Sequence, residues 1–90
     1  MSASKPRRNE DLVVRDFQDG AETAILDLAS GQVVSLNATA AAIWYLCDGE
    51  RDEAAIAREV VDVHPDVDPV LALNDVRRTL AELAERGLVG

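Results

Sequence analysis

The apolar residues of this 90-residue chain change their spacing at Asn37. Before Asn37, short apolar runs that partly alternate with polar residues are separated by turn signals at residues 18–20 and 30–31, which is typical of strands. Loops this short form hairpins, so the strands should make an antiparallel three-stranded sheet. We predict strands over residues 12–17, 23–28 and 32–36.

After Asn37 the apolar residues recur every three or four positions, which is the spacing of amphipathic helices. Asn37, Asp52 and Asp68 are suitable N-cap residues, and Asp68 precedes a proline, which the first turn of a helix tolerates. Gly49 and Gly87 suit the left-handed backbone position that follows a helix end. We therefore predict helices from these caps to about residues 47, 64 and 86. Three strands followed by three helices make a small α+β domain.

The same spacing predicts which side chains share a face. In the second strand Ala24, Leu26 and Leu28 lie on one face, as in a half-buried strand. Each predicted helix has one apolar stripe. The stripe of the first helix is Ala40, Ile43, Trp44 and Cys47, that of the second is Ile56, Val60 and Val63, and that of the third is Leu73, Val76, Leu80 and Leu83. Leu88 and Val89 should fold back onto the domain as an apolar plug.

The composition excludes several classes of protein. A single cysteine allows no internal disulfide and no cysteine-based zinc site, and it indicates a reducing compartment. Nine basic against 17 acidic residues give a net charge of −8, which argues against binding to nucleic-acid phosphates. No apolar run approaches the roughly 18–20 residues that span a bilayer. We expect a cytoplasmic protein without nucleic-acid or membrane partners, with a disordered segment over residues 1–10 and one domain over residues 11–90.

No group of residues points to catalysis. His64 is the single histidine and lies in a loop with acidic neighbours, a spacing that fits a solvated loop better than a metal site. Cys47 lies on an apolar stripe, where a free thiol acts as a small hydrophobic side chain. The glycines are isolated at the ends of predicted elements, so no phosphate-binding loop is present. We expect no metal, no cofactor and no enzymatic activity.

The informative feature is the edge of the predicted sheet. The third strand has no proline, lysine or inward charge to protect its unpaired backbone groups, so an extended peptide can add to it as a further strand. The third helix is a candidate second wall for such a groove, through Asn74, Arg77, Arg78 and Ala81. Arg77 and Arg78 either hold an acidic peptide side chain or are ordinary surface charges.

Several short motifs, in this order and spacing, resemble the PqqD family over about residues 11–89. They are the run Val34-Ser35-Leu36-Asn37-Ala38-Thr39-Ala40, then Ile43-Trp44, Leu46-Cys47-Asp48-Gly49, Asp75-Val76, Leu80, Leu83 and Gly87-Leu88-Val89. The resemblance implies a winged-helix-like fold that acts as a recognition element for ribosomally made, modified peptides. Such a domain binds the leader segment of a precursor peptide and presents it to a modifying enzyme, for example a radical SAM protein.

The resemblance also implies where the leader lies, which is along the third strand in a cleft formed with the third helix. Carried over to this sequence, the strand contributes Gln32, Val33, Val34, Ser35 and Leu36, and the helix contributes Leu73, Asn74, Arg77, Arg78 and Ala81. Relatives from lasso-peptide pathways often carry an aromatic residue in this strand, which the present chain lacks.

Two other functions fit the same predicted fold. A winged-helix-like domain can bind nucleic acid, although the acidic composition disfavours it here, and fold alone does not fix function. A small accessory subunit that binds a folded protein through its helices is the second. An unprotected edge strand can also pair with its own copy, so a homodimer is possible.

Overall fold

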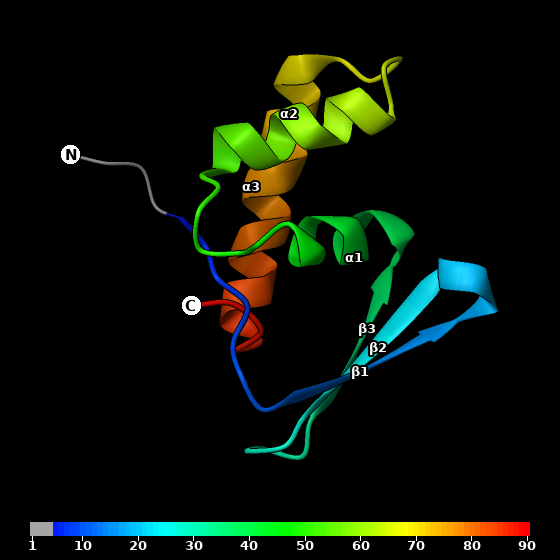
Figure 1. The fold of residues 1–90 in the computed structure, drawn as a ribbon, viewed down its shortest axis with the longest axis vertical. Helices are drawn as coiled ribbons and strands as arrows, with labels where there is room; N and C mark the ends of the chain where they lie inside the picture. The colour runs from blue at the N-terminus through cyan, green and yellow to red at the C-terminus, as the bar shows by residue number, and fades with distance from the viewer. Residues whose placement is uncertain (1–4) are drawn as a thin grey trace.

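The computed structural model describes residues 5–90, which begin with a three-stranded antiparallel sheet (Figure 1). The strands are β1 (Leu12–Phe17), β2 (Glu22–Asp27) and β3 (Val33–Asn37), and their order in the sheet is β1-β2-β3. A short 3-10 turn, η1 (Gln18–Gly20), joins β1 to β2. The predicted meander is confirmed, with each strand boundary within a residue of its expected place.

Three helices follow the sheet: α1 (Ala38–Tyr45), α2 (Glu53–Val63) and α3 (Pro69–Glu85). Each of the three predicted N-caps accepts a backbone N–H at 2.8 Å: Asn37 from Ala40, Asp52 from Ala55, and Asp68 from Val70. The α+β order of three strands and three helices is therefore confirmed. Within residues 5–90 no helix is long and apolar enough to cross a membrane.

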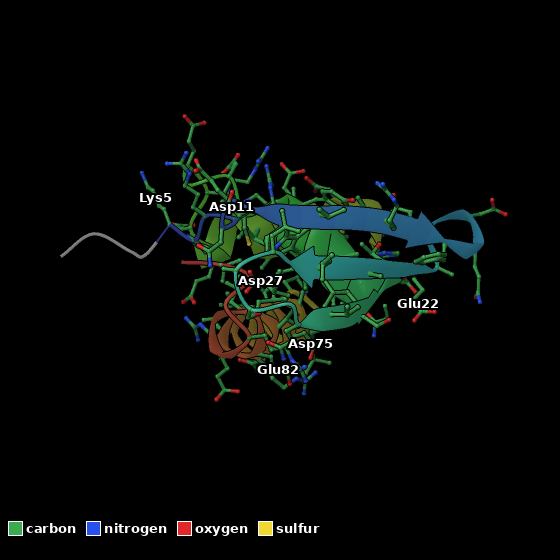
Figure 2. All side chains as sticks on the ribbon, turned by 90° about the horizontal axis from the view of Figure 1, so that it is seen from below. Lys5, Asp11, Glu22, Asp27, Asp75 and Glu82 are labelled. Atoms are coloured by element: carbon green, nitrogen blue, oxygen red, sulfur yellow. The ribbon has the colours of Figure 1, made fainter. Side chains whose placement is uncertain are left out.

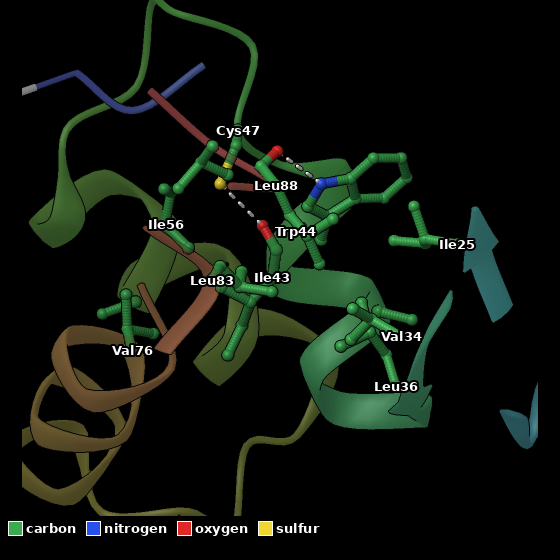
Figure 3. Packing of buried hydrophobic residues seen from close by; sticks show 13 residues of the cluster. Ile25, Val34, Leu36, Ile43, Trp44, Cys47, Ile56, Val76, Leu83 and Leu88 are labelled. Atoms are coloured by element: carbon green, nitrogen blue, oxygen red, sulfur yellow. Dashed lines mark hydrogen bonds between the residues drawn. The ribbon is translucent and has the colours of Figure 1, made fainter. Parts of the chain in front are cut away.

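The core lies between one face of the sheet and the three helices (Figure 3). Trp44 of α1 joins two parts of it, because its indole Nε1 donates a hydrogen bond of 3.1 Å to the backbone oxygen of Leu88. Leu88 and Val89 are buried, as the predicted apolar plug requires. The other large buried side chains come from every layer: Ile25, Val34, Leu36, Ile43, Cys47, Ile56, Val76 and Leu83.

The predicted face of β2 is wrong. Thr23 and Ile25 are buried, whereas Leu28 is exposed and Leu26 is only half-buried. The alternating pattern placed the polar Thr23 outward, but its hydroxyl donates to the Asp16 carboxylate at 2.8 Å, which satisfies it inside the protein. A buried hydroxyl costs little once it is hydrogen-bonded.

The apolar stripe of α2 is also shorter than predicted. Ile56 is fully buried, but Val63, two turns further along, has 71% of its surface exposed. Val63 is the last residue of α2. Together with Val60 and Leu46 it lines an open hollow between α1 and α2. The helix therefore leaves the core before it ends.

The segment predicted to be disordered differs from expectation in its second half. Residues 1–4 lie outside the described residues, but Pro6 is buried and the residues after it pair with the end of the chain. Arg7 accepts from the Gly90 N–H at 2.9 Å, and the Arg8 N–H donates to the Cys47 oxygen at 2.9 Å. Backbone pairing does not depend on apolar side chains, so the polar composition of this segment concealed it.

Two substitutions on α2 test how the helix packs. Ile56→Ala removes a fully buried side chain and should lower the free energy of unfolding by about 2–5 kcal/mol. Val63→Ala removes a mostly exposed side chain and should change it by less than about 0.5 kcal/mol. Urea unfolding followed by Trp44 fluorescence measures both; equal losses would contradict the described packing of α2.

Candidate functional site

β3 forms one of the two open edges of the sheet, opposite the β1 edge, and pairs only with β2. The Asp27 N–H donates to the Gln32 oxygen at 2.9 Å, so these opposed residues form a hydrogen-bonded pair. Bonded and non-bonded pairs alternate along an antiparallel ladder. With the observed register, the next bonded partners on β3 are Val34 and Leu36, whose N–H and C=O groups therefore point toward β2.

The alternate residues of β3 present their backbone groups to the open edge. These residues are Val33 and Ser35, which stand opposite β2 at non-bonded positions. Their side chains lie on the outward face of the sheet: Val33 is 64% exposed, and the Ser35 hydroxyl donates to the Glu22 carboxylate. Within residues 5–90 no side chain of α3 is hydrogen-bonded to this strand. β3 thus offers free donors and acceptors at the spacing of a strand partner.

A cleft of about 190 Å³ lies beside this edge, between β3 and α3. Figure 2 shows α3 next to β3 at the side of the sheet, with Asp75 and Glu82 on the helix. α3 runs opposite in direction to β3 (Figure 1). The strand side and the start of α1 supply Val34, Ser35, Leu36, Asn37 and Ala40, and α3 with its C-cap residue supplies Thr79, Glu82, Leu83 and Arg86.

The cleft combines an apolar floor with polar walls. Leu83, Val34 and Leu36 are buried beneath it, whereas Glu82 and Arg86 are exposed and lie one helical turn apart. Neither charge takes part in an ion pair within the described part of the chain. The cleft therefore offers one carboxylate and one guanidinium to a ligand, beside free backbone groups of the strand.

The structure places the predicted strand residues at this site. Val34, Ser35 and Leu36 line the cleft, and Val33 precedes them on the same edge. Gln32 lies in the hairpin loop just before β3, where its oxygen accepts from Asp27. The predicted strand wall is therefore brought together, while Gln32 lies outside the strand and its backbone oxygen is used within the hairpin.

None of the five α3 residues predicted for the second wall lines this cleft. Arg77 points toward α2, where its Nε donates to the Glu53 carboxylate at 2.8 Å. Arg78 donates to Asp75 at 2.8 Å on the helix surface. Of the other three, Leu73 packs toward α2, Ala81 lines a separate hollow with Pro6 and Val89, and Asn74 is exposed.

The cleft residues that were not predicted are Thr79, Glu82 and Leu83 of α3 and its C-cap Arg86, with Asn37 and Ala40 across the cleft. The sequence does indicate that these four residues share a helix face, because positions 79, 82, 83 and 86 follow the i, i+3, i+4, i+7 spacing. An apolar stripe has two flanks, however, and only the path of the chain decides which flank faces the sheet. Leu83 was predicted as core, and it is also the floor of the cleft.

The other candidate chemistries have structural explanations. The Cys47 thiol is buried, where its Sγ donates to the Ile43 oxygen at 3.3 Å, and burial raises its pKa to about 11. The thiol is therefore protonated at neutral pH and unsuited to act as a nucleophile. His64 lines the hollow between α1 and α2. Within residues 5–90 no three His, Cys, Asp or Glu side chains gather closely enough to hold a metal ion.

These observations define the class of protein, which is a small α+β domain in which an open strand edge lies next to a helix. The family model described as "Coenzyme PQQ synthesis protein D (PqqD)" matches residues 22–89. The chain belongs to this PqqD family. No match is found among curated proteins.

Solved structures share the fold. The structure of TbiB1 in complex with the TbiA(beta) leader peptide is 23% identical, with a TM-score of 0.75 over 92% of this chain and 93% of that chain. A lasso peptide synthetase B1 complexed with the leader peptide is 24% identical, with a TM-score of 0.78 over 97% of this chain and 99% of that chain.

A third structure is the PqqD part of Methylobacterium extorquens PqqCD, described as a functional, stand-alone recognition element for ribosomally synthesised and post-translationally modified peptides. It is 23% identical, with a TM-score of 0.75 over 99% of this chain and 95% of that chain. The match extends across the whole domain, including the strand edge and the helix that flank the cleft.

Proposed function

We propose that this chain binds the leader segment of a ribosomally synthesised precursor peptide as a fourth strand on β3, in the cleft with α3. The observation that carries the proposal is the open edge of β3 beside that cleft. An extended peptide would bond to the backbone of Val33 and Ser35 while alternate side chains enter the cleft, which is the general mode of strand addition. Membership of the PqqD family supports the choice of ligand.

Two of the similar solved structures support the same choice, since both contain a leader peptide by their descriptions. The charges of the cleft support it further. Main-chain bonds give affinity without sequence preference, so selection among peptides must come from side chains. Glu82 and Arg86 are free to contribute that selection.

The role that follows is presentation rather than catalysis. A domain that holds the leader by its backbone leaves the remainder of the precursor free to enter a second protein. We propose that this second protein is a peptide-modifying enzyme, such as a radical SAM protein, and that the encounter takes place in the cytoplasm. The single cysteine, Cys47, supports the location only through composition, because proteins of reducing compartments keep their thiols free.

Self-association would use the same edge. Two copies could pair through β3, since each offers the same unpaired groups. We propose that such a homodimer competes with the peptide, because one edge accepts only one partner strand.

Two substitutions at Ser35 test strand addition. Ser35→Pro removes an outward N–H that is free for the peptide, and leader binding should weaken at least about tenfold, which corresponds to about 1.4 kcal/mol. Ser35→Ala keeps the N–H and removes only the hydroxyl bonded to Glu22, so its affinity should stay within about threefold of the unmodified chain.

Isothermal titration with the leader segment of a candidate precursor peptide measures both affinities, and far-ultraviolet circular dichroism verifies folding. Tight binding by a folded Ser35→Pro variant would contradict strand addition at β3.

Charge reversal on α3 tests which side of the helix faces the peptide. Arg86→Glu reverses the charge of a side chain that lines the cleft, and it should alter the dissociation constant of the leader by about tenfold. Arg77→Glu breaks an exposed pair with Glu53 away from the cleft, and it should leave the dissociation constant within about threefold. The opposite ranking of the two variants, in the same titration, would place the peptide on the α2 side of α3.

A further inference from the structure

The outward face of the sheet carries an aliphatic row that the core does not use. The register aligns Val13 with Leu26 and Leu26 with Val33, one residue from each strand. The helices pack on the opposite face, around Ile25 and Val34. The row therefore lies on the uncovered face and runs across the sheet from the β1 edge to the β3 edge.

The exposure of the side chains in this row is greatest at its β3 end. Val13 and Leu26 are half-buried by their neighbours, whereas Val33 is 64% exposed. Val13 and Val33 stand at the two ends of the row, each with one neighbour in it, yet only Val33 is largely exposed. Edge strands usually carry charged or protective residues, so an exposed valine such as Val33 on an edge strand is unusual unless a further strand covers it.

The backbone of Val33 fixes what that strand would bring. Its N–H and C=O face the open edge, so in antiparallel pairing a single peptide residue would exchange both bonds with it. The side chain of that residue would lie beside Val33 on the outward face, since directly opposed side chains share a face. Its neighbours in the peptide would point the other way, toward Glu82, Leu83 and Arg86 in the cleft.

We propose that Val33 is a specificity-determining residue, which selects an aliphatic or aromatic side chain at one position of the bound peptide and so extends the row Val13–Leu26–Val33 onto a fourth strand. This inference rests on the proposed function. It adds that the peptide is recognised on two faces, by an apolar contact outside the sheet and by the charged cleft inside.

Display selection of random peptides of about ten residues, long enough for a typical strand, tests the inference without knowledge of the precursor. Peptides selected on the unmodified chain should share an apolar residue at one position. Peptides selected on Val33→Glu should carry Lys or Arg at that position, with the flanking pattern retained. Leu28→Glu is the matched control, because Leu28 is a similarly exposed aliphatic residue beyond β2 and should leave the pattern unchanged.

Individual peptides give the magnitude. Replacing the shared apolar residue by Ser should weaken binding to the unmodified chain by up to about fivefold, and binding to Val33→Glu should change less. One outcome would overturn this inference and leave the proposed function standing. In that outcome the selected peptides depend on the N–H of Ser35, but they show the same pattern on the unmodified chain and on the Val33→Glu variant. Failure to select any peptide that is sensitive to Ser35→Pro would overturn both.

Discussion

The backbone of β3 is satisfied on one side only, and this constraint governs the rest of the site. α3 lies next to the strand but cannot complete the ladder, because the N–H and C=O groups of a helix bond within the helix. A cleft therefore remains where a fourth strand would stand. A loop or helix packed closely against the edge would have protected it from other chains. Here the neighbouring helix instead forms the second wall of an open site.

The position of α3 is fixed by contacts at its C-terminal end. Gly87, at a φ of +74°, reverses the chain after the helix, and the Leu88 N–H donates back to the Leu83 oxygen at 2.9 Å. Leu88 in turn receives the indole N–H of Trp44, and the guanidinium of Arg8 lies 5.7 Å from the indole ring centroid. The two ends of the described chain thus hold the helix against α1, which sets the width of the cleft.

Much of this arrangement could be predicted from the sequence because its causes are local. Asn37, Asp52 and Asp68 act as caps through their own neighbouring residues, and the short loops allow only hairpins. The face of β2 could not be predicted, since Thr23 is buried through a hydroxyl bond to Asp16 on another strand. The same limit applies to the site. The edge strand was identified from its composition, but the side of α3 that faces it depends on how the chain crosses from α2.

The central claim is that the outward backbone groups of β3 accept a peptide strand, and residue-resolved amide hydrogen exchange tests it most directly. Without peptide, the N–H groups of Val34 and Leu36 should exchange slowly, because they bond to β2, while those of Val33 and Ser35 exchange fast. On addition of the leader peptide, Val33 and Ser35 should become protected, which would give continuous protection along the strand. Fast exchange at Val33 and Ser35 with saturating peptide bound would contradict the account.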